Sequence, residues 1–366
     1  MRLTIDRAEL LPPLQRIQGV VGSRTSMPIL ANCLLAAGEG GLSVVATNLE
    51  IGLRDRVAAE VEAPGRVCVA AKKLFEVVRE LPEGEPVALE VVEERLTVRA
   101  GRTVTRLLGL PPEEFPALPE VDEGSGVTLP AETLARLLGQ VAFAMSTDIT
   151  RQTLGGVLFA YDGEGHLEAV ATDGHRLALR RLEVEGGGEP FREIVPRKAV
   201  SEVRRLVEEG ETPVEIRFAE KQALVRRGPL ALVTRLIEGR FPEYQRAIPT
   251  TGKSLVVVDR EAFARACRRV AVLAHEKTHQ VELVVEPGQM VILTQNPELG
   301  EAREELEVAL EGEPVHISFN AAYILDILNA MEGETVRLEM SGSGNPALFT
   351  EAEAADYLCV LMPMRL

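Results

Sequence analysis

The chain has 366 residues, of which 46% are hydrophobic and 26% are charged, enough for two or three domains that each bury a core. Its formal net charge of −16 at pH 7 argues against a protein that coats nucleic acid by bulk attraction, although a local basic face remains compatible with it. The N-terminus lacks the apolar segment of a signal peptide and no long apolar run occurs, so we expect a cytoplasmic protein without a membrane span.

The four cysteines, Cys33, Cys68, Cys267 and Cys359, lie far apart and form no C-x-x-C pair. This spacing predicts neither a disulfide framework nor a zinc ribbon. We expect the cysteines to be small core residues, and we expect no cofactor.

The first third of the chain opens with a helical pattern and continues with alternating strand patterns. Asp6 precedes a segment in which Leu10, Leu14 and Ile17 recur at helical spacing, which predicts a helix at this point. The segments that follow predict strands at 31–37, 42–47, 53–62 and 66–70, a helix at 71–81, and strands at 87–92, 95–100 and 104–110. Because strand follows strand directly, the sheet should be antiparallel.

The same order of elements recurs twice. The predicted second helices of the three thirds end near Leu81, Leu206 and Met331, which follow one another at intervals of 125 residues. First helices are expected at 130–143 and 259–273. This long period predicts three repeated α+β domains, each an antiparallel sheet with two helices. The predicted boundaries are 1–119, 120–247 and 248–366.

Three motifs stand in order on this repeat: Ala-Thr-Asp-Gly-His-Arg-Leu at 171–177, Gly-Arg-Phe-Pro-Glu-Tyr-Gln-Arg at 239–246, and Met-Pro-Met-Arg-Leu at 362–366. Together they resemble the bacterial sliding clamp, the beta subunit of DNA polymerase III, over the whole chain. The resemblance implies a non-enzymatic processivity factor in the bacterial cytoplasm, associated with the nucleoid. It further implies a head-to-tail homodimer that closes a six-domain ring around double-stranded DNA. The polymerase, the clamp loader and repair factors would bind it through short peptide motifs.

Positive charge is concentrated on the segments predicted to be helices, except for the sixth, at 320–331. Base-reading motifs and aromatic platforms are missing from the sequence, as suits a protein that slides. With the resemblance, these cations predict a DNA-facing set. The set is Arg24, Lys72, Arg79, Arg136, Arg197, Lys198, Arg204, Arg205, Arg268 and Arg269.

The resemblance also implies a pocket for partner peptides between the second and third domains. Its leucines and methionines would offer an adaptable apolar surface, and its arginines would hold a peptide by hydrogen bonds. Ala247 is smaller than the aliphatic residue expected at that position. The matching residues are Leu154, Thr172, Gly174, His175, Arg176, Leu177, Pro242, Arg246, Ala247, Val360, Met362, Pro363, Met364 and Arg365.

For the dimer interface the resemblance implies an apolar centre with opposite charges around it. Arg303 departs from the acidic pattern on one side and is expected to weaken the match or to pair with a neighbouring glutamate. Gln152 and Thr153 stand where some relatives have aromatic DNA contacts. The interface residues are Lys72, Lys73 and Leu107 on one side, and Val272, Leu273, Glu298, Glu301 and Glu304 on the other.

Two other functions compete with the clamp. His275-Glu-Lys-Thr-His279 matches H-E-x-x-H, with Glu298, Glu301 or Glu304 as a third ligand, the pattern of a zinc peptidase. Residues 280–286 alternate like a strand, which leaves no room for the helix this motif needs, so His279 is predicted to lie in a turn. The second alternative is a protein-interaction scaffold that never surrounds DNA.

Overall fold

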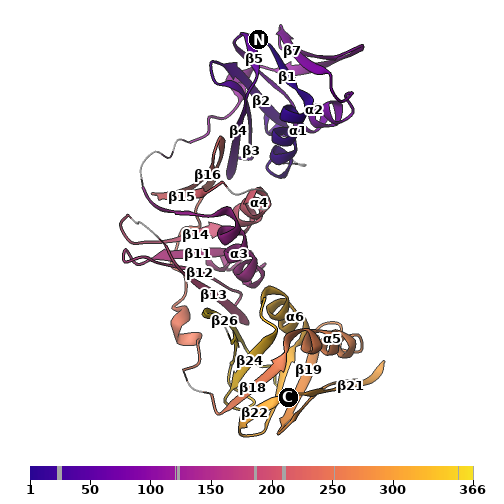
Figure 1. Ribbon diagram of the computed structural model, residues 1–366, viewed down its shortest axis with the longest axis vertical. Coiled ribbons are helices and arrows are strands. Elements are labelled where there is room, and N and C mark those ends of the chain that lie inside the picture. Colours follow the sequence, from indigo (N-terminus) through magenta and orange to yellow (C-terminus); the bar gives the residue numbers. More distant parts are fainter. Residues whose placement is uncertain are drawn as a thin grey trace. The chain divides into compact units, whose positions relative to one another are not determined.

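The computed structural model describes residues 1–22, 27–119, 121, 124–184, 188–207, 212–250, 252–352 and 354–365. Within these residues the chain forms six α-helices and 26 strands, and every strand pairing is antiparallel (Figure 1). The contacts define two compact units. The first comprises Met1–Leu134, Glu185–Gly188 and Ser201–Leu236, and the second comprises Ala135–Val184, Glu189–Val200 and Ile237–Leu366.

The first repeat begins with a strand that the sequence analysis did not predict. Its elements are β1 (Arg2–Asp6), α1 (Arg7–Arg16), β2 (Asn32–Gly38), β3 (Gly41–Thr47), β4 (Ile51–Val57), β5 (Glu60–Ala63), β6 (Gly65–Ala70), α2 (Ala71–Arg79), β7 (Pro86–Val92), β8 (Arg95–Ala100) and β9 (Thr103–Leu110). The single strand predicted at 53–62 is wrong, because the chain changes partner within it. Val57 ends the pairing with β3, and β5 then pairs with β1.

The second and third repeats follow the same order. The second contains β10 (Ser125–Leu129), α3 (Ala131–Val141), β11 (Gly156–Tyr161), β12 (His166–Thr172), β13 (Arg176–Glu183), β14 (Phe191–Pro196), α4 (Arg197–Val207), β15 (Val214–Ala219), β16 (Gln222–Arg227) and β17 (Leu230–Arg235). The third contains β18 (Ser254–Asp259), α5 (Arg260–Ala271), β19 (Gln280–Glu286), β20 (Gln289–Asn296), β21 (Gly300–Glu307), β22 (Ala309–Gly312), β23 (Val315–Asn320), α6 (Ala321–Ala330), β24 (Thr335–Met340), β25 (Ala347–Glu351) and β26 (Ala354–Leu361). The predicted helices and the antiparallel α+β class are confirmed.

Two kinds of strand pairing recur between equivalent elements. In each repeat the strand before the first helix pairs with the first strand after the second helix, as in β1–β7, β10–β15 and β18–β24. The last strand of one meander also pairs with the last strand of the following repeat, as in β4–β17 and β13–β26. The first unit therefore holds one sheet of 13 strands, and the second unit holds sheets of nine and four strands.

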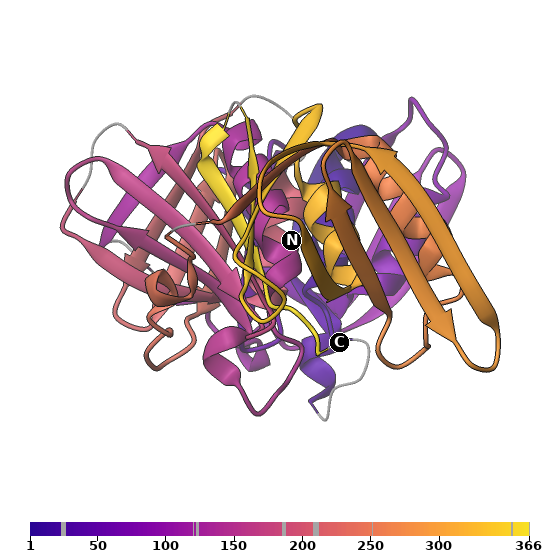
Figure 2. The same cartoon turned by 90° about the horizontal axis from the view of Figure 1, so that it is seen from below.

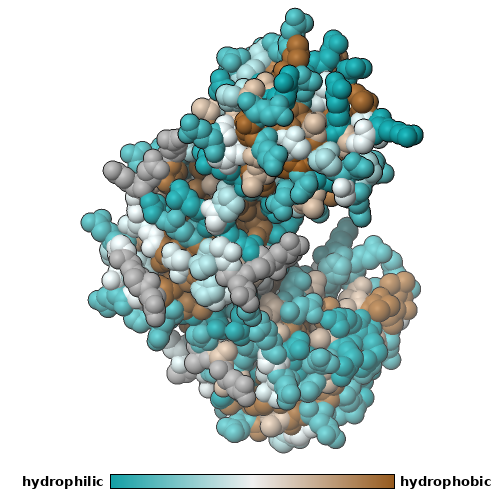
Figure 3. Space-filling model, turned by 45° about the horizontal axis from the view of Figure 1, so that its top comes forward, coloured by the Kyte–Doolittle hydropathy of each residue, from teal (hydrophilic) through white to brown (hydrophobic). Residues whose placement is uncertain are grey.

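The helices cover these sheets with one apolar face. Helix α2 buries Ala71, Leu74 and Val78 and exposes Lys72. Helices α5 and α6 lie side by side against the four-stranded sheet (Figure 2). Hydrophilic residues cover most of the face shown in Figure 3, with hydrophobic residues in separate patches. Among the described residues, no helix is long and apolar enough to span a membrane.

The 171–177 motif and the segments at 46–52 and 293–299, which hold the same place in the first and third repeats, form related turns. The Thr47 hydroxyl donates to the Ile51 carbonyl at 3.0 Å, and the Thr172 hydroxyl donates to the Arg176 carbonyl at 2.7 Å. Both bonds close the turn between the second and third strands of a meander. In the third repeat, the side chain of Asn296 accepts a backbone N–H within the equivalent turn. Local polar side chains therefore set this turn in all three repeats.

Candidate peptide, DNA and subunit surfaces

The turn between β12 and β13 is held by its own side chains. Gly174 has a φ of 88°, a left-handed conformation that glycine adopts without a Cβ penalty, and its N–H donates to the Thr172 hydroxyl at 3.1 Å. The Asp173 carboxylate accepts the N–H groups of His175 and Arg176 at 2.8 and 3.0 Å. These bonds leave the side chain of His175 exposed at the tip.

The C-terminal segment is tied to this turn and then to the third repeat. Leu177 on β13 lies opposite Val360 on β26. Beyond the end of β26, the N–H of Met362 donates to the His175 carbonyl at 2.8 Å, and the N–H of Met364 donates to the Ser318 carbonyl at 2.8 Å. The side chain of Met362, by contrast, remains 42% exposed.

The predicted peptide-binding residues, which we call the partner-peptide surface, all lie in the second unit and divide into two layers. Leu154, Leu177 and Val360 are buried in one apolar cluster with Phe241 and Tyr244 of the linker. They support the surface from beneath. The exposed residues are those that a peptide can reach, namely Gly174, His175, Pro242, Arg246, Ala247, Met362 and Arg365.

Tyr244 fixes the linker to the central repeat. Its hydroxyl donates to the carboxylate of Glu168, and its ring packs edge-on against Phe241. Burial, together with the negative charge of Glu168, raises the pKa of Tyr244 to about 12. The hydroxyl therefore stays protonated at neutral pH and keeps this bond.

Arg176 is largely buried and fully engaged with the protein. Its guanidinium pairs with Asp173 at 3.1 Å and Asp326 at 2.5 Å, and donates to the Phe143 carbonyl at 2.8 Å. It also lies 4.3 Å from the centre of the Tyr323 ring, and its side chain is only 10% exposed. Arg176 thus positions the turn against α6 and offers little surface to a ligand. The sequence analysis missed Tyr323 and Asp326. Their i, i+3 spacing places both side chains on one face of the predicted helix and could have indicated a shared contact.

The predicted DNA-binding cations differ in exposure and in whether they have a partner within the chain. Lys72, Lys198 and Arg204 are exposed, and they form no ion pair within the part of the chain that the structure describes. Arg197 instead donates to the carbonyls of Met145 and Ser146 at 2.7 and 2.6 Å. Arg197 therefore stabilises the loop after α3, whereas the three exposed residues keep their charged groups accessible to solvent.

The remaining cations of this set that the structure describes are exposed but have partners. Arg136 pairs with Glu332 at 2.7 Å, and Arg269 makes two bonds to Glu304 at 2.6 and 3.1 Å. The other bonds join Arg79 to Glu80, Arg205 to Glu202 and Arg268 to Asn329. Surface pairs of this kind are weak, so a phosphate can compete for these groups. Arg24 lies outside the described residues.

Two strands, β21 and β9, leave most of one edge unpaired among the described residues. β21 ends the four-stranded sheet, and β9 contacts β6 only through Gly109 and Leu110. Both edges carry exposed apolar side chains at or near them, with Leu108 78% and Val272 75% exposed. Arg303 on β21 pairs with Glu305. This confirms the expectation that Arg303 would pair with a neighbouring glutamate. The predicted interface residue Glu304 is engaged by Arg269 within the chain.

The H-E-x-x-H motif lies in a turn, as predicted. Helix α5 ends at Ala271, the N–H of His279 donates to the His275 carbonyl at 2.8 Å, and His279 has a φ of 50°. Strand β19 begins at the next residue. The described residues contain no group of three side chains placed to hold a metal.

The chain contains three copies of one α+β repeat, with cations along five of the six described helices and partly unpaired strand edges on the first and third repeats. These features define a clamp-type protein. The N-terminal, central and C-terminal domain models of the DNA polymerase III beta subunit match residues 1–119, 128–243 and 245–365. The chain belongs to this family, the beta sliding clamps, which are processivity factors and not enzymes.

Named relatives match along the whole chain. The beta sliding clamps of Caulobacter vibrioides and Escherichia coli K12 are 38% and 36% identical to it, each with full coverage of both chains. The crystal structure of DNA polymerase III subunit beta from Pseudomonas aeruginosa superimposes with a TM-score of 0.97 at 38% identity and full coverage of both chains. The sliding clamp of Bacillus subtilis gives 0.95 at 29% identity, covering all of this chain and 99% of the other.

Proposed function

We propose that two copies of this chain join head to tail into a six-domain ring that encircles duplex DNA and tethers the replicative polymerase. The domains are 1–119, 120–247 and 248–366. The ring works in the bacterial cytoplasm at the nucleoid, and a separate loader opens it. Polymerases and repair factors dock on it through short peptides.

The pattern of strand pairing carries the ring proposal. Within the chain, the last strand of a meander pairs with the last strand of the following repeat, as β4 does with β17 and β13 with β26. The third meander ends in β21, which pairs only with β20 among the described residues, and β9 of the first repeat has no such partner from a preceding meander there. Pairing of β21 with β9 of a second copy continues the same rule. Leu107, Val272 and Leu273 then meet at the centre of the interface, with Lys72, Lys73, Glu298, Glu301 and Glu304 around them.

The DNA contacts are made by cations on the helices without reading base sequence. Lys72, Lys198 and Arg204 are the primary phosphate ligands because they are exposed and form no ion pair within the described residues. Arg24, Arg79, Arg136, Arg205, Arg268 and Arg269 add to the positive lining. Contacts to phosphates alone fix no sequence, so the ring is free to slide.

Retention on circular DNA tests the ring. The protein is loaded onto nicked circular DNA by a matched loader, washed with high salt, and measured again after the circle is cut. We expect the protein to survive the wash on circles and to leave cut DNA, since only topology holds it. Equal loss from both forms, after loading at low salt had been verified, would instead identify a scaffold that never surrounds DNA.

The partner-peptide surface is tested by Met362→Ala. Removal of an exposed apolar contact should weaken a fluorescent clamp-binding peptide about tenfold, since roughly 1.4 kcal/mol corresponds to that factor. Arg99→Ala is the matched control, because Arg99 lies on β8 in the first unit. Unchanged affinity of the Met362 variant would contradict the assignment of this surface.

A further inference from the structure

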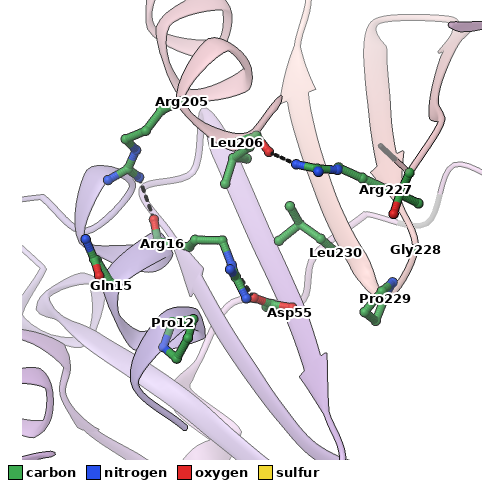
Figure 4. A pocket seen from close by; sticks show the side chains of 11 residues that line it. Pro12, Gln15, Arg16, Asp55, Arg205, Leu206, Arg227, Gly228, Pro229 and Leu230 are labelled. Carbon is green, nitrogen blue, oxygen red and sulfur yellow. Dashed lines mark hydrogen bonds and ion pairs between the residues drawn. The ribbon is translucent and has the colours of Figure 1, made fainter. Parts of the chain in front are cut away.

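A pocket opens in the first unit beside the paired strands β4 and β17 (Figure 4). Its volume is about 490 Å³, within the range of sites that hold small ligands or a few peptide side chains. Its walls come from α1, the end of α4 and the turn between β16 and β17. It shares no residue with the partner-peptide surface.

Three guanidinium groups and one carboxylate line this pocket. Arg16 pairs with the buried Asp55 at 2.7 Å, Arg205 donates to the Arg16 carbonyl at 2.6 Å, and Arg227 donates to the Leu206 carbonyl at 2.5 Å. Figure 4 shows these bonds along the pocket wall. Each guanidinium carries five N–H donors, so these bonds hold the groups in place and leave donors for a ligand. The lining has an excess of positive charge in a chain of net charge −16.

The equivalent place in the second unit is filled by an aromatic ring. The 125-residue interval places Asp55 at the position of Arg180, which lies opposite Tyr357 on β26. The Tyr357 side chain is completely buried, and its hydroxyl donates to the Gln140 carbonyl at 2.8 Å. In the first unit the corresponding residue of β17 is Leu230, next to the Ala231–Arg54 pair. Leucine is shorter than tyrosine, and the pocket lies where the ring would be.

We propose that this pocket binds a peptide segment in which an aromatic side chain stands beside a carboxylate. The ring packs on Leu206, Pro229 and Leu230, which supply the apolar part of the lining. The carboxylate accepts hydrogen bonds from Arg227 and Arg16, whose planar groups suit two-point recognition. The peptide would match the pocket in shape, because no aromatic ring fills the place that Tyr357 fills in the second unit. It would also match in charge, because the guanidinium groups have N–H donors left for a carboxylate.

Binding is measured by titration of the full-length protein with the probe acetyl-Glu-Tyr-Glu-amide. Acetyl-Gln-Tyr-Gln-amide and acetyl-Glu-Ala-Glu-amide are the comparison probes, and each should bind about tenfold more weakly or worse because it lacks one of the two features. Equal binding of all three probes, or no binding of the first, overturns the proposal. Displacement of the probe by a short DNA duplex but not by excess unlabelled peptide also overturns it, since phosphates would then be the occupant.

Two substitutions locate the site. Leu230→Tyr introduces a ring like that of Tyr357 in the second unit, and Arg227→Leu removes a hydrogen-bond donor; each should lower affinity about tenfold. Arg226→Leu is the control, because adjacent strand residues face opposite sides of the sheet, and it should bind the probe normally. Unfolding midpoints equal to that of the original chain verify that the variants fold. Unchanged affinity of both Leu230→Tyr and Arg227→Leu refutes the site.

The acidic residues Glu208, Glu209 and Glu211 adjoin the lining in sequence and lie outside the described residues. A variant with Glu208, Glu209 and Glu211 changed to Gln tests whether the chain's own carboxylates occupy the arginines. The proposal expects the probe to bind this variant and the original chain alike. Binding that appears only in the variant would assign the pocket to that segment of the chain and overturn the proposal.

Discussion

Replacement of Arg176 by Ala should destabilise the second unit chiefly by loosening the turn against α6. The guanidinium joins Asp173, Asp326 and the Phe143 carbonyl, so its loss leaves two carboxylates and a carbonyl without their donor. Asp173 is 13% exposed and cannot regain full hydration, whereas Asp326, at 45%, can. The side chain lies in the space between the Phe143 and Tyr323 rings, which also lose a cation contact.

Removing one partner of a buried ion pair costs about 3–5 kcal/mol. Because Asp326 can rehydrate, we expect a loss at the lower end, about 3 kcal/mol. Arg246→Ala is the control within the same surface, because the Arg246 side chain is 83% exposed and, among the described residues, its ion pair is with Glu243. A surface pair of this kind contributes about 0–1 kcal/mol.

Hydrogen exchange measures these losses locally, in the amides of α6 and of 171–177, and peptide titration measures binding on the same samples. Arg176→Ala should speed exchange in both segments and weaken the peptide as a consequence. Arg176→Lys should recover part of the protection, because it restores the charge but not the planar fork. Unchanged protection with weakened peptide binding would refute this reasoning and would mean that Arg176 contacts the peptide directly.

Three further results are expected. Leu108→Asp should yield a monomer in sedimentation because it places a charge at an apolar subunit edge, while Ile149→Asp, at an even more exposed site elsewhere, should leave a dimer. Asp55→Asn should change the pH dependence of stability, because burial raises the pKa of Asp55 above its usual 3.8. The original chain gains stability as pH falls through that raised pKa towards 3.8, and the variant lacks this gain. Urea unfolding at a series of acidic pH values measures both; a gain in the variant and none in the original chain would contradict the prediction. Tyr357→Phe should cost about 1–2 kcal/mol, since a buried hydrogen bond is lost; a cost near zero in urea unfolding would contradict the bond.

Periodicity alone located the helices and the repeat, because both depend on spacings within one element or on a fixed interval. The helices predicted at 71–81 and 320–331 appear as α2 and α6. The turn at His279 also followed from local pattern, since the strand after it left no room for a helix. These inferences needed no knowledge of distant contacts.

Partners distant in sequence were beyond prediction. The chain changes strand partner between β4 and β5 because β1 accepts β5, and the sequence marks no break there. Nothing in the spacing indicated that Arg269 would neutralise Glu304, 35 positions away, so one residue expected at DNA and one expected at the interface engage each other. The commitment of Arg176 to Asp326 is another such contact, 150 positions apart.

The two edges proposed to pair between subunits, β9 and β21, belong to different strands, and this has a consequence for assembly. A chain with unlike ends can add a neighbour at each end, and each addition exposes a fresh edge of the same kind. Such growth stops only when the last edge meets the first. An unclosed copy is therefore a building block for an indefinite fibre, and hydrophobic edge strands such as β9 are templates for that growth. Refolding at low protein concentration should favour closed rings, because closure is intramolecular once two copies have met, whereas fibre growth depends on concentration.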